Sequence, residues 1–187
     1  MTKNLLIISL LLITNMIANA KQKAVKEYFG NTLNIGAGVG YYGYINTPLP
    51  VFIVNYEIDV VRNFTLAPFI GLYSFRNNSY GFNTNPKGYT YRETVMPIGI
   101  KGTYYFDELL HANAKWDFYA AASSAFLVRR ISWDADYYGS HDVYKNRPDL
   151  SMDAHLGAEY HFSKEAGLFL DVSTGVSTIG LAIHFNK

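Results

Sequence analysis

The clearest evidence for the fold class lies in residues 150–185, LSMDAHLGAEYHFSKEAGLFLDVSTGVSTIGLAIHF. In its first segment the even positions, from Leu150 to Phe162, are apolar, and the odd positions are small, polar or charged. The same alternation returns over 166–173 and 177–185. A period of two places successive side chains on opposite faces of a β-strand, whereas a helix would need apolar residues three and four apart. The stretch therefore predicts three strands joined by turns at 163–165 and 174–176.

Residues 1–20 have the layout of a secretory signal peptide. Lys3 supplies a positive flank, Leu5–Ile13 forms an apolar core, and Ala18-Asn19-Ala20 is a small-residue cleavage site. We expect export and cleavage after Ala20, which leaves residues 21–187 as one domain.

Composition narrows the class of protein. With 16 basic and 15 acidic residues the chain is almost neutral, which argues against a nucleic-acid binder. The absence of cysteine argues against a disulfide-stapled fold and a lipid anchor on cysteine. After residue 20 no window offers the ~18 apolar residues of a membrane helix, so spanning a membrane would require a closed β-barrel. The 16 Tyr and 12 Phe suit the aromatic girdles of such a barrel.

Alternation continues upstream and predicts eight strands in total. Pro68 weakens the third strand because proline cannot donate to a ladder. Short connections at 62–63, 107–114 and 163–165 alternate with longer ones at 43–49, 76–93 and 131–149, as in outer-membrane barrels. The predicted fold is all-β, an eight-stranded antiparallel up-and-down transmembrane β-barrel. The expected strands cover residues 32–42, 50–61, 64–75, 94–106, 116–130, 150–162, 166–173 and 177–185.

The C-terminal block resembles the end of the small bacterial outer-membrane β-barrel domain family. Asp171 stands where that family usually has Glu, and two residues follow Phe185. The resemblance implies location in the cell outer membrane, insertion by the barrel-assembly machinery, and contact with outer-membrane lipid and lipopolysaccharide. It implies no single activity. The matching positions are Gly157, Ala158, Tyr160, Phe162, Ser163, Gly167, Leu168, Phe169, Asp171, Gly175, Gly180, Leu181 and Phe185.

The predicted inward faces carry both acids and bases. An eight-stranded barrel is about wide enough for its own side chains to fill, which argues against a general porin. Buried charges must be paired, so we predict a charge network that plugs the lumen. Its expected members are Glu57, Asp59, Lys101, Asp117, Arg129, Asp153, His155, Glu159, His161, Asp171 and His184.

One strand face also carries groups that could ligate a metal: Asp153, His155, Glu159 and His161. Spacings of two and four residues along a strand correspond to about 7 Å and 13 Å. One strand therefore cannot close a coordination shell, and we predict neither a metal nor another cofactor.

An enzymatic alternative rests on His161-Phe162-Ser163, which is similar to the His-x-Ser element of the lipid A deacylase family. A serine nucleophile needs a histidine base and an orienting acid within hydrogen-bond reach. The predicted topology places this element at a periplasmic turn, away from lipid A, and Asp171 faces inward. We therefore expect no enzyme, with a lipid A-modifying hydrolase as the alternative.

A second alternative is a periplasmic barrel that carries a small apolar ligand. Such a protein needs an apolar lumen, with Glu57, Asp117 and Glu159 facing water.

The two longest predicted loops, 76–93 and 131–149, are rich in aromatic residues and arginine, which make good contact residues. Aromatic residues near strand ends also seat a barrel in the membrane interface. The predicted function is a structural envelope protein, or a subunit that binds a partner through these loops. The candidate contact residues are Tyr80, Phe82, Tyr89, Trp133, Tyr137, Tyr138, Tyr144 and Arg147.

Overall fold

The computed structural model describes residues 31–40, 49–79, 89–110, 115–133 and 150–185. The predicted signal peptide lies outside these residues, as do the loop candidates Tyr80, Phe82, Tyr137, Tyr138, Tyr144 and Arg147. Within the described ranges no helix has the length and apolar character needed to cross a membrane.

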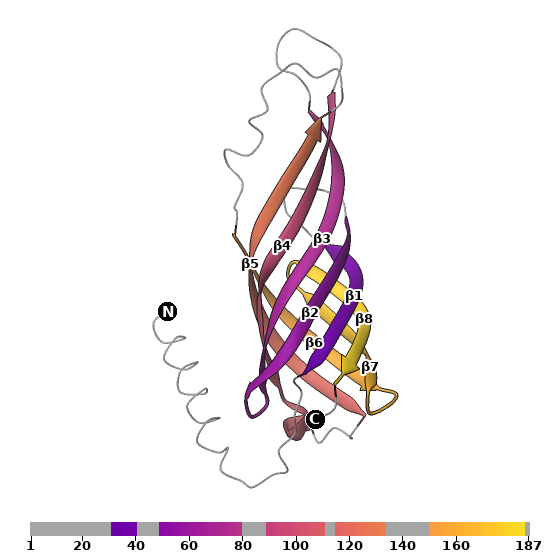
Figure 1. Cartoon of the computed structure of the whole chain (residues 1–187). Helices are drawn as coiled ribbons and strands as arrows, with labels where there is room; N and C mark the ends of the chain where they lie inside the picture. The colour runs from indigo at the N-terminus through magenta and orange to yellow at the C-terminus, as the bar shows by residue number, and fades with distance from the viewer. Residues whose placement is uncertain (1–30, 41–48, 80–88, 111–114, 134–149, 186–187) are drawn as a thin grey trace, which may run out of the picture.

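Eight strands pair in sequence order into a closed antiparallel barrel, and β1 pairs with β8 to complete it (Figure 1). The predicted fold class is confirmed. A short helix, α2 (Asp107–Leu110), connects β4 to β5. The strands are β1 (Thr32–Gly40), β2 (Leu49–Val61), β3 (Phe64–Ser79), β4 (Tyr89–Tyr105), β5 (Trp116–Trp133), β6 (Leu150–His161), β7 (Ala166–Ser173) and β8 (Val176–His184).

The barrel is taller on one side than on the other. Strands β3, β4 and β5 contain 16, 17 and 18 residues, whereas β7 and β8 contain 8 and 9. In Figure 1 the three long strands rise past the rest of the barrel. We call residues 74–79, 89–94 and 130–133 the wall. The opposite end, with the turn at 62–63, α2 and the turn at 162–165, is the short-turn end.

The wall differs from the sequence prediction, which assigned residues 76–93 to a loop. Backbone pairing continues through Arg76↔Arg92 to Ser79↔Tyr89, and from Thr94↔Arg130 to Tyr91↔Trp133. The alternation of side chains also continues, because Tyr91, Glu93 and Val95 are buried, whereas Arg92 is exposed.

Prolines interrupt the ladders without changing their register. Between β2 and β3 the pairs Asn55↔Phe69 and Ile58↔Leu66 follow one register, and pairing is missing at Pro68 between them. Between β3 and β4 pairing is missing at Pro97 in the same way. The predicted weakness of the third strand is thus a local loss of hydrogen bonds, as expected for a residue without an N–H group.

The outward face of the barrel is apolar. Phe52, Phe126, Leu156 and Leu170 have exposed fractions of 63%, 69%, 64% and 53%. A continuous apolar surface of this kind is unusual in a monomeric soluble protein and is typical of a barrel that faces lipid.

Aromatic side chains gather near the short-turn end of this surface. The Trp116 ring lies 5.9 Å from Phe118 and 4.9 Å from Tyr160, measured between ring centroids. Tyr56 lies 6.2 Å from Phe185 in the same sense. Such a girdle marks the boundary between hydrocarbon and headgroups. The chain is therefore built to span a membrane.

The interior has two parts of different character. Toward the short-turn end it is polar, as described below. Toward the wall it holds an apolar cluster, which the sequence analysis did not expect because it predicted a polar lumen throughout. The cluster consists of Leu49, Val51, Tyr73, Phe75, Val95 and Leu127.

Candidate functional site

Glu57 is the centre of the first polar network inside the barrel. Its side chain comes from β2 and the residue is 4% exposed. Oε1 accepts a hydrogen bond of 2.8 Å from Asn34 Nδ2. Oε2 accepts bonds of 2.6 Å from Thr65 Oγ1 and 2.8 Å from the Tyr105 hydroxyl. Donors from β1, β3 and β4 thus compensate for removing one carboxylate from water.

Asp171 of β7 is the centre of the second network. Its Oδ2 accepts hydrogen bonds of 2.6 Å from Lys101 Nζ and 3.0 Å from the Tyr119 hydroxyl, and Oδ1 lies 2.7 Å from His155 Nδ1. Lys101 Nζ also lies 4.8 Å from the centre of the Tyr119 ring, a cation–π contact. Gly157 makes this arrangement possible, because a Cβ there would overlap the Tyr119 ring.

The second network contains a Ser–His–Asp chain that the sequence analysis did not single out. Ser123 Oγ lies 2.9 Å from His155 Nε2, and His155 Nδ1 lies 2.7 Å from Asp171 Oδ1. These are distances of a catalytic triad. Ser123, however, lies in the middle of β5, whose residues pair with both β4 and β6. The ladders occupy the backbone amides that an oxyanion hole would need.

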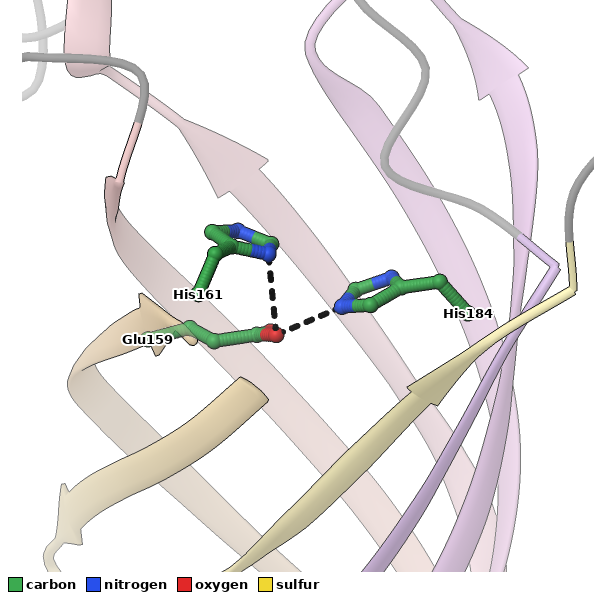
Figure 2. Close-up of side chains that lie close together, drawn as sticks. All are labelled: Glu159, His161 and His184. Carbon is green, nitrogen blue, oxygen red and sulfur yellow. Dashed lines mark hydrogen bonds and ion pairs between the residues drawn. The ribbon is translucent and has the colours of Figure 1, made fainter. Parts of the chain in front are cut away.

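A third group of polar side chains closes the barrel at the short-turn end. Glu159 and His161 come from β6 and His184 comes from β8 (Figure 2). Glu159 Oε1 lies 2.7 Å from His184 Nε2 and 3.7 Å from His161 Nδ1. Asp117 Oδ2 lies 2.7 Å from His161 Nε2.

The remaining predicted network residues lie closer to the barrel ends. Arg129 Nη1 lies 3.0 Å from Glu93 Oε1, with side-chain exposures of 4% and 0%. Asp153 accepts a hydrogen bond of 3.2 Å from Thr174 Oγ1. Asp59 is half-buried on β2. Glu93 was missed because the expected fourth strand began at residue 94, although the alternation Tyr91, Glu93, Val95 was a readable signal.

Trp133, predicted to be a loop contact residue, is the last residue of β5. It is half-buried, and its ring lies 4.9 Å from that of Tyr91. Tyr89, another predicted contact residue, is the first residue of β4.

The element that suggested a lipid A deacylase does not assemble into a nucleophile and base. His161 Nε2 faces Asp117 inside the barrel. Ser163 is exposed in the turn, where its Oγ accepts a hydrogen bond from the backbone N–H of Glu165.

The requirement for a barrel that carries an apolar ligand in water is not met. Glu57 and Glu159 are 4% and 5% exposed inside the barrel, and the outward face is apolar.

These features define a membrane-spanning, eight-stranded antiparallel β-barrel whose interior is occupied by its own side chains. The predicted resemblance to small outer-membrane barrels is thus confirmed at the level of fold. No protein-family model and no curated protein matches the sequence.

Solved structures of similar shape include three barrels. Neisserial surface protein A (NspA) has a TM-score of 0.47 at 14% identity, covering 82% of this chain and 95% of its own. The Yersinia pestis attachment invasion locus protein Ail, in complex with the heparin analogue sucrose octasulfate, has a TM-score of 0.44 at 8% identity, with the same two coverages of 82% and 95%. A de novo designed transmembrane β-barrel has a TM-score of 0.44 at 15% identity, covering 84% and 98%. The fold assignment itself rests on the strand pairing in this chain.

Proposed function

We propose that this protein is a non-enzymatic outer-membrane barrel that does not conduct and that presents its wall and long loops to the cell surface. The observation that supports this proposal is that the barrel's own side chains fill its interior. Polar networks around Glu57 and Asp171 occupy the half of the lumen toward the short-turn end, and the apolar cluster together with the buried Arg129–Glu93 ion pair occupies the half toward the wall. An eight-stranded barrel packed in this way leaves no aqueous path.

The proposed orientation places the short-turn end in the periplasm and the wall outside. Outer-membrane barrels have short periplasmic turns and longer external connections. In this proposal the signal peptide is cleaved after Ala20 and the barrel-assembly machinery inserts the chain. The loop residues between 80 and 88 and between 134 and 149 are then available to a protein or glycan partner.

Three exposed arginines on the outer surface of the wall support contact with lipopolysaccharide. Arg76 lies directly opposite Arg92 in the β3–β4 ladder, and Arg130 of β5 lies opposite Thr94. Like charges directly opposite each other are destabilising unless an anion lies between them. No acidic residue faces outward among the wall positions whose side chains are described.

The arginines also lie at the right height. The apolar outer surface extends to Leu72 and Val128, which are 48% and 51% exposed, and each lies within four residues of an arginine of the wall. Arginine pairs well with phosphate through charge-assisted hydrogen bonds. We therefore propose that this surface binds the phosphate groups of lipopolysaccharide.

Conductance in a planar lipid bilayer tests the first half of the proposal. The wild-type barrel should insert without producing steady channels. The control is the double variant Tyr73→Ala, Phe75→Ala, which removes two large side chains from the apolar cluster and so loosens the packing of the interior. Steady porin-like conductance of the wild type would contradict the proposal.

Binding to lipopolysaccharide micelles tests the second half. Each basic residue near an anionic lipid surface contributes about 1 kcal/mol, so replacing Arg76, Arg92 and Arg130 by Ala should weaken binding by roughly a hundredfold. The matched control replaces Arg62, Lys115 and Lys164, three cations of the short-turn end. Equal loss in both triple variants would show that only net charge matters and would overturn the assignment.

A further inference from the structure

Glu159, His161 and His184 form a compact set of potential metal ligands at the short-turn end. One ligand atom from each residue lies within 4.8 Å of those from the other two. Figure 2 shows the Glu159 carboxylate between the two imidazole rings, facing a ring nitrogen of each. The residues are adjacent only after folding, because β6 and β8 are separated by β7.

The other nitrogen of each histidine already has a partner. His161 Nε2 lies 2.7 Å from Asp117 Oδ2, and His184 Nδ1 lies 2.9 Å from Thr32 Oγ1. Histidines that ligate metals almost always have such an oxygen partner on the second nitrogen, which fixes the tautomer and the ring orientation. Here the partners are Asp117 and Thr32, and His161 Nδ1 and His184 Nε2 are the nitrogens that face Glu159.

The hydrogen-bonding roles at His161 leave room for a positive charge at this place, either a proton on the ring or a metal ion. A carboxylate only accepts hydrogen bonds, so when the ring is neutral its hydrogen lies on Nε2, toward Asp117. The lone pair on Nδ1 then faces Glu159, which is itself an acceptor. A cation between Nδ1 and Oε1 makes ligands of both atoms. At His184, binding requires the ring hydrogen to move from Nε2, which faces Glu159, to Nδ1, where the Thr32 hydroxyl can accept it.

We propose that Glu159, His161 and His184 bind one divalent transition-metal ion, with Zn²⁺ as the best fit. Two histidines and one glutamate are an established protein ligand set for zinc, with the fourth position left open. A tetrahedral zinc ion separates its ligand atoms by roughly 3.3 Å. The two contacts to Glu159, 2.7 Å and 3.7 Å, lie on either side of this value, and all three ligand atoms lie within 4.8 Å of one another. The His161 and His184 side chains are 20% and 18% exposed, which leaves a path for the ion.

Gly167 of β7 provides the space that the carboxylate occupies. It pairs with both His161 and Ala182, so it lies between the two strands that supply the ligands. A Cβ at Gly167 would overlap Oε1 of Glu159. A side chain there would displace the ligand oxygen.

No metal was predicted from the sequence because the ligands of one strand alone cannot close a coordination shell. The structure separates that set, since His155 is bound to Asp171, and it supplies His184 from the last strand instead. The resulting site bridges β6 and β8 and, through Thr32, reaches the β1–β8 pair that closes the barrel.

Titration of the purified, metal-free barrel in detergent tests the proposal, with Zn²⁺ in competition with a chromogenic chelator and with Co²⁺ as a spectroscopic probe. The wild type should bind one equivalent, and Co²⁺ should give the visible absorption of a tetrahedral N/O site. His161→Gln and His184→Gln should abolish saturable binding, whereas His155→Gln, in the neighbouring network, should retain it. Asp117→Asn should weaken binding by about 10- to 100-fold.

A second measurement needs no variant and so does not depend on folding of the mutants. Modification by diethyl pyrocarbonate, mapped by mass spectrometry, should slow at His161 and His184 when Zn²⁺ is added, with no change at His155. Absence of one-equivalent binding by the wild type, or equal zinc binding by His155→Gln and His184→Gln, would overturn the site. So would unchanged modification rates at His161 and His184.

Discussion

The ammonium group of Lys101 lies 2.6 Å from Oδ2 of Asp171 inside the barrel, where the two side chains are 11% and 3% exposed. The two residues belong to β4 and β7, which are not neighbours in the barrel. Their contact therefore crosses the lumen and joins two separated strands of the barrel.

Lys101→Met should strongly destabilise the barrel. Removing one partner of a buried ion pair leaves an uncompensated charge, and the expected loss in the free energy of unfolding is about 3–5 kcal/mol. Urea unfolding from lipid vesicles, followed by tryptophan fluorescence, measures it. The lipid-facing neighbour Ile100→Met is the control and should change stability by less than about 1.5 kcal/mol. Equal stability of both variants would contradict a structural role for the ion pair.

Gly157→Ala should disturb the same network by a steric route. The new methyl group would overlap the Tyr119 ring and push the hydroxyl away from Asp171, at an expected cost of about 1–3 kcal/mol. Gly102→Ala is a matched control, because its Cβ would lie 3.1 Å from the Phe64 ring on the outward side. In the same urea titration, Gly157→Ala should have a lower free energy of unfolding than Gly102→Ala. The reverse order would show that the interior has more room than described.

Leu170→Arg tests which surface faces lipid. Leu170 lies in the middle of β7 and is 53% exposed, so a charge there should cost about 2–4 kcal/mol in lipid vesicles. Val60→Arg, beside the turn at 62–63, should cost only about 0–1 kcal/mol because it lies near the interface. A barrel that tolerates arginine equally at both positions would not be embedded as described.

Ser123 should not react as a catalytic serine. Its hydrogen bond to His155 matches a triad, but the amides around it are committed to strand pairing. We expect no labelling by a fluorophosphonate probe in native membranes, and no change in lipid A mass on overproduction. Labelling that Ser123→Ala abolishes would instead identify a serine hydrolase. Ser163→Ala is the control for the alternative element and should have no effect on either readout.

Local alternation was sufficient to predict the eight strands, their order and most of the inward charges. Lys101, Asp171 and Glu57 are buried, on the faces that the alternation assigned to the interior, because the parity of a position within a strand decides which face its side chain is on. Their partners were less accessible, since the contact of Lys101 with Asp171 depends on the stagger of four strands. His184 could not be joined to Glu159 for the same reason.

The errors in the prediction concern the residues at which strands begin and end. Assigning residues 76–93 and 131–149 to loops hid the buried Glu93 and placed Trp133 among the loop residues, although the alternation continues through both. The apolar cluster was also missed, because Leu49 was placed in a loop and Tyr73, Val95 and Leu127 were not recognised as inward positions at one height.

Because its strands differ in length, the barrel has two sides that differ in height. Within the bilayer an eight-stranded cylinder looks much the same from every side, so its rotation about the membrane normal has no consequence. Above the bilayer, the 18 residues of β5 and the 8 of β7 break that symmetry. Among the described residues, β4 continues beyond the apolar belt as part of the wall, whereas β7 and β8 do not, so neighbours on the two sides meet different surfaces. Another molecule can therefore distinguish the rotational orientation of the barrel about the membrane normal.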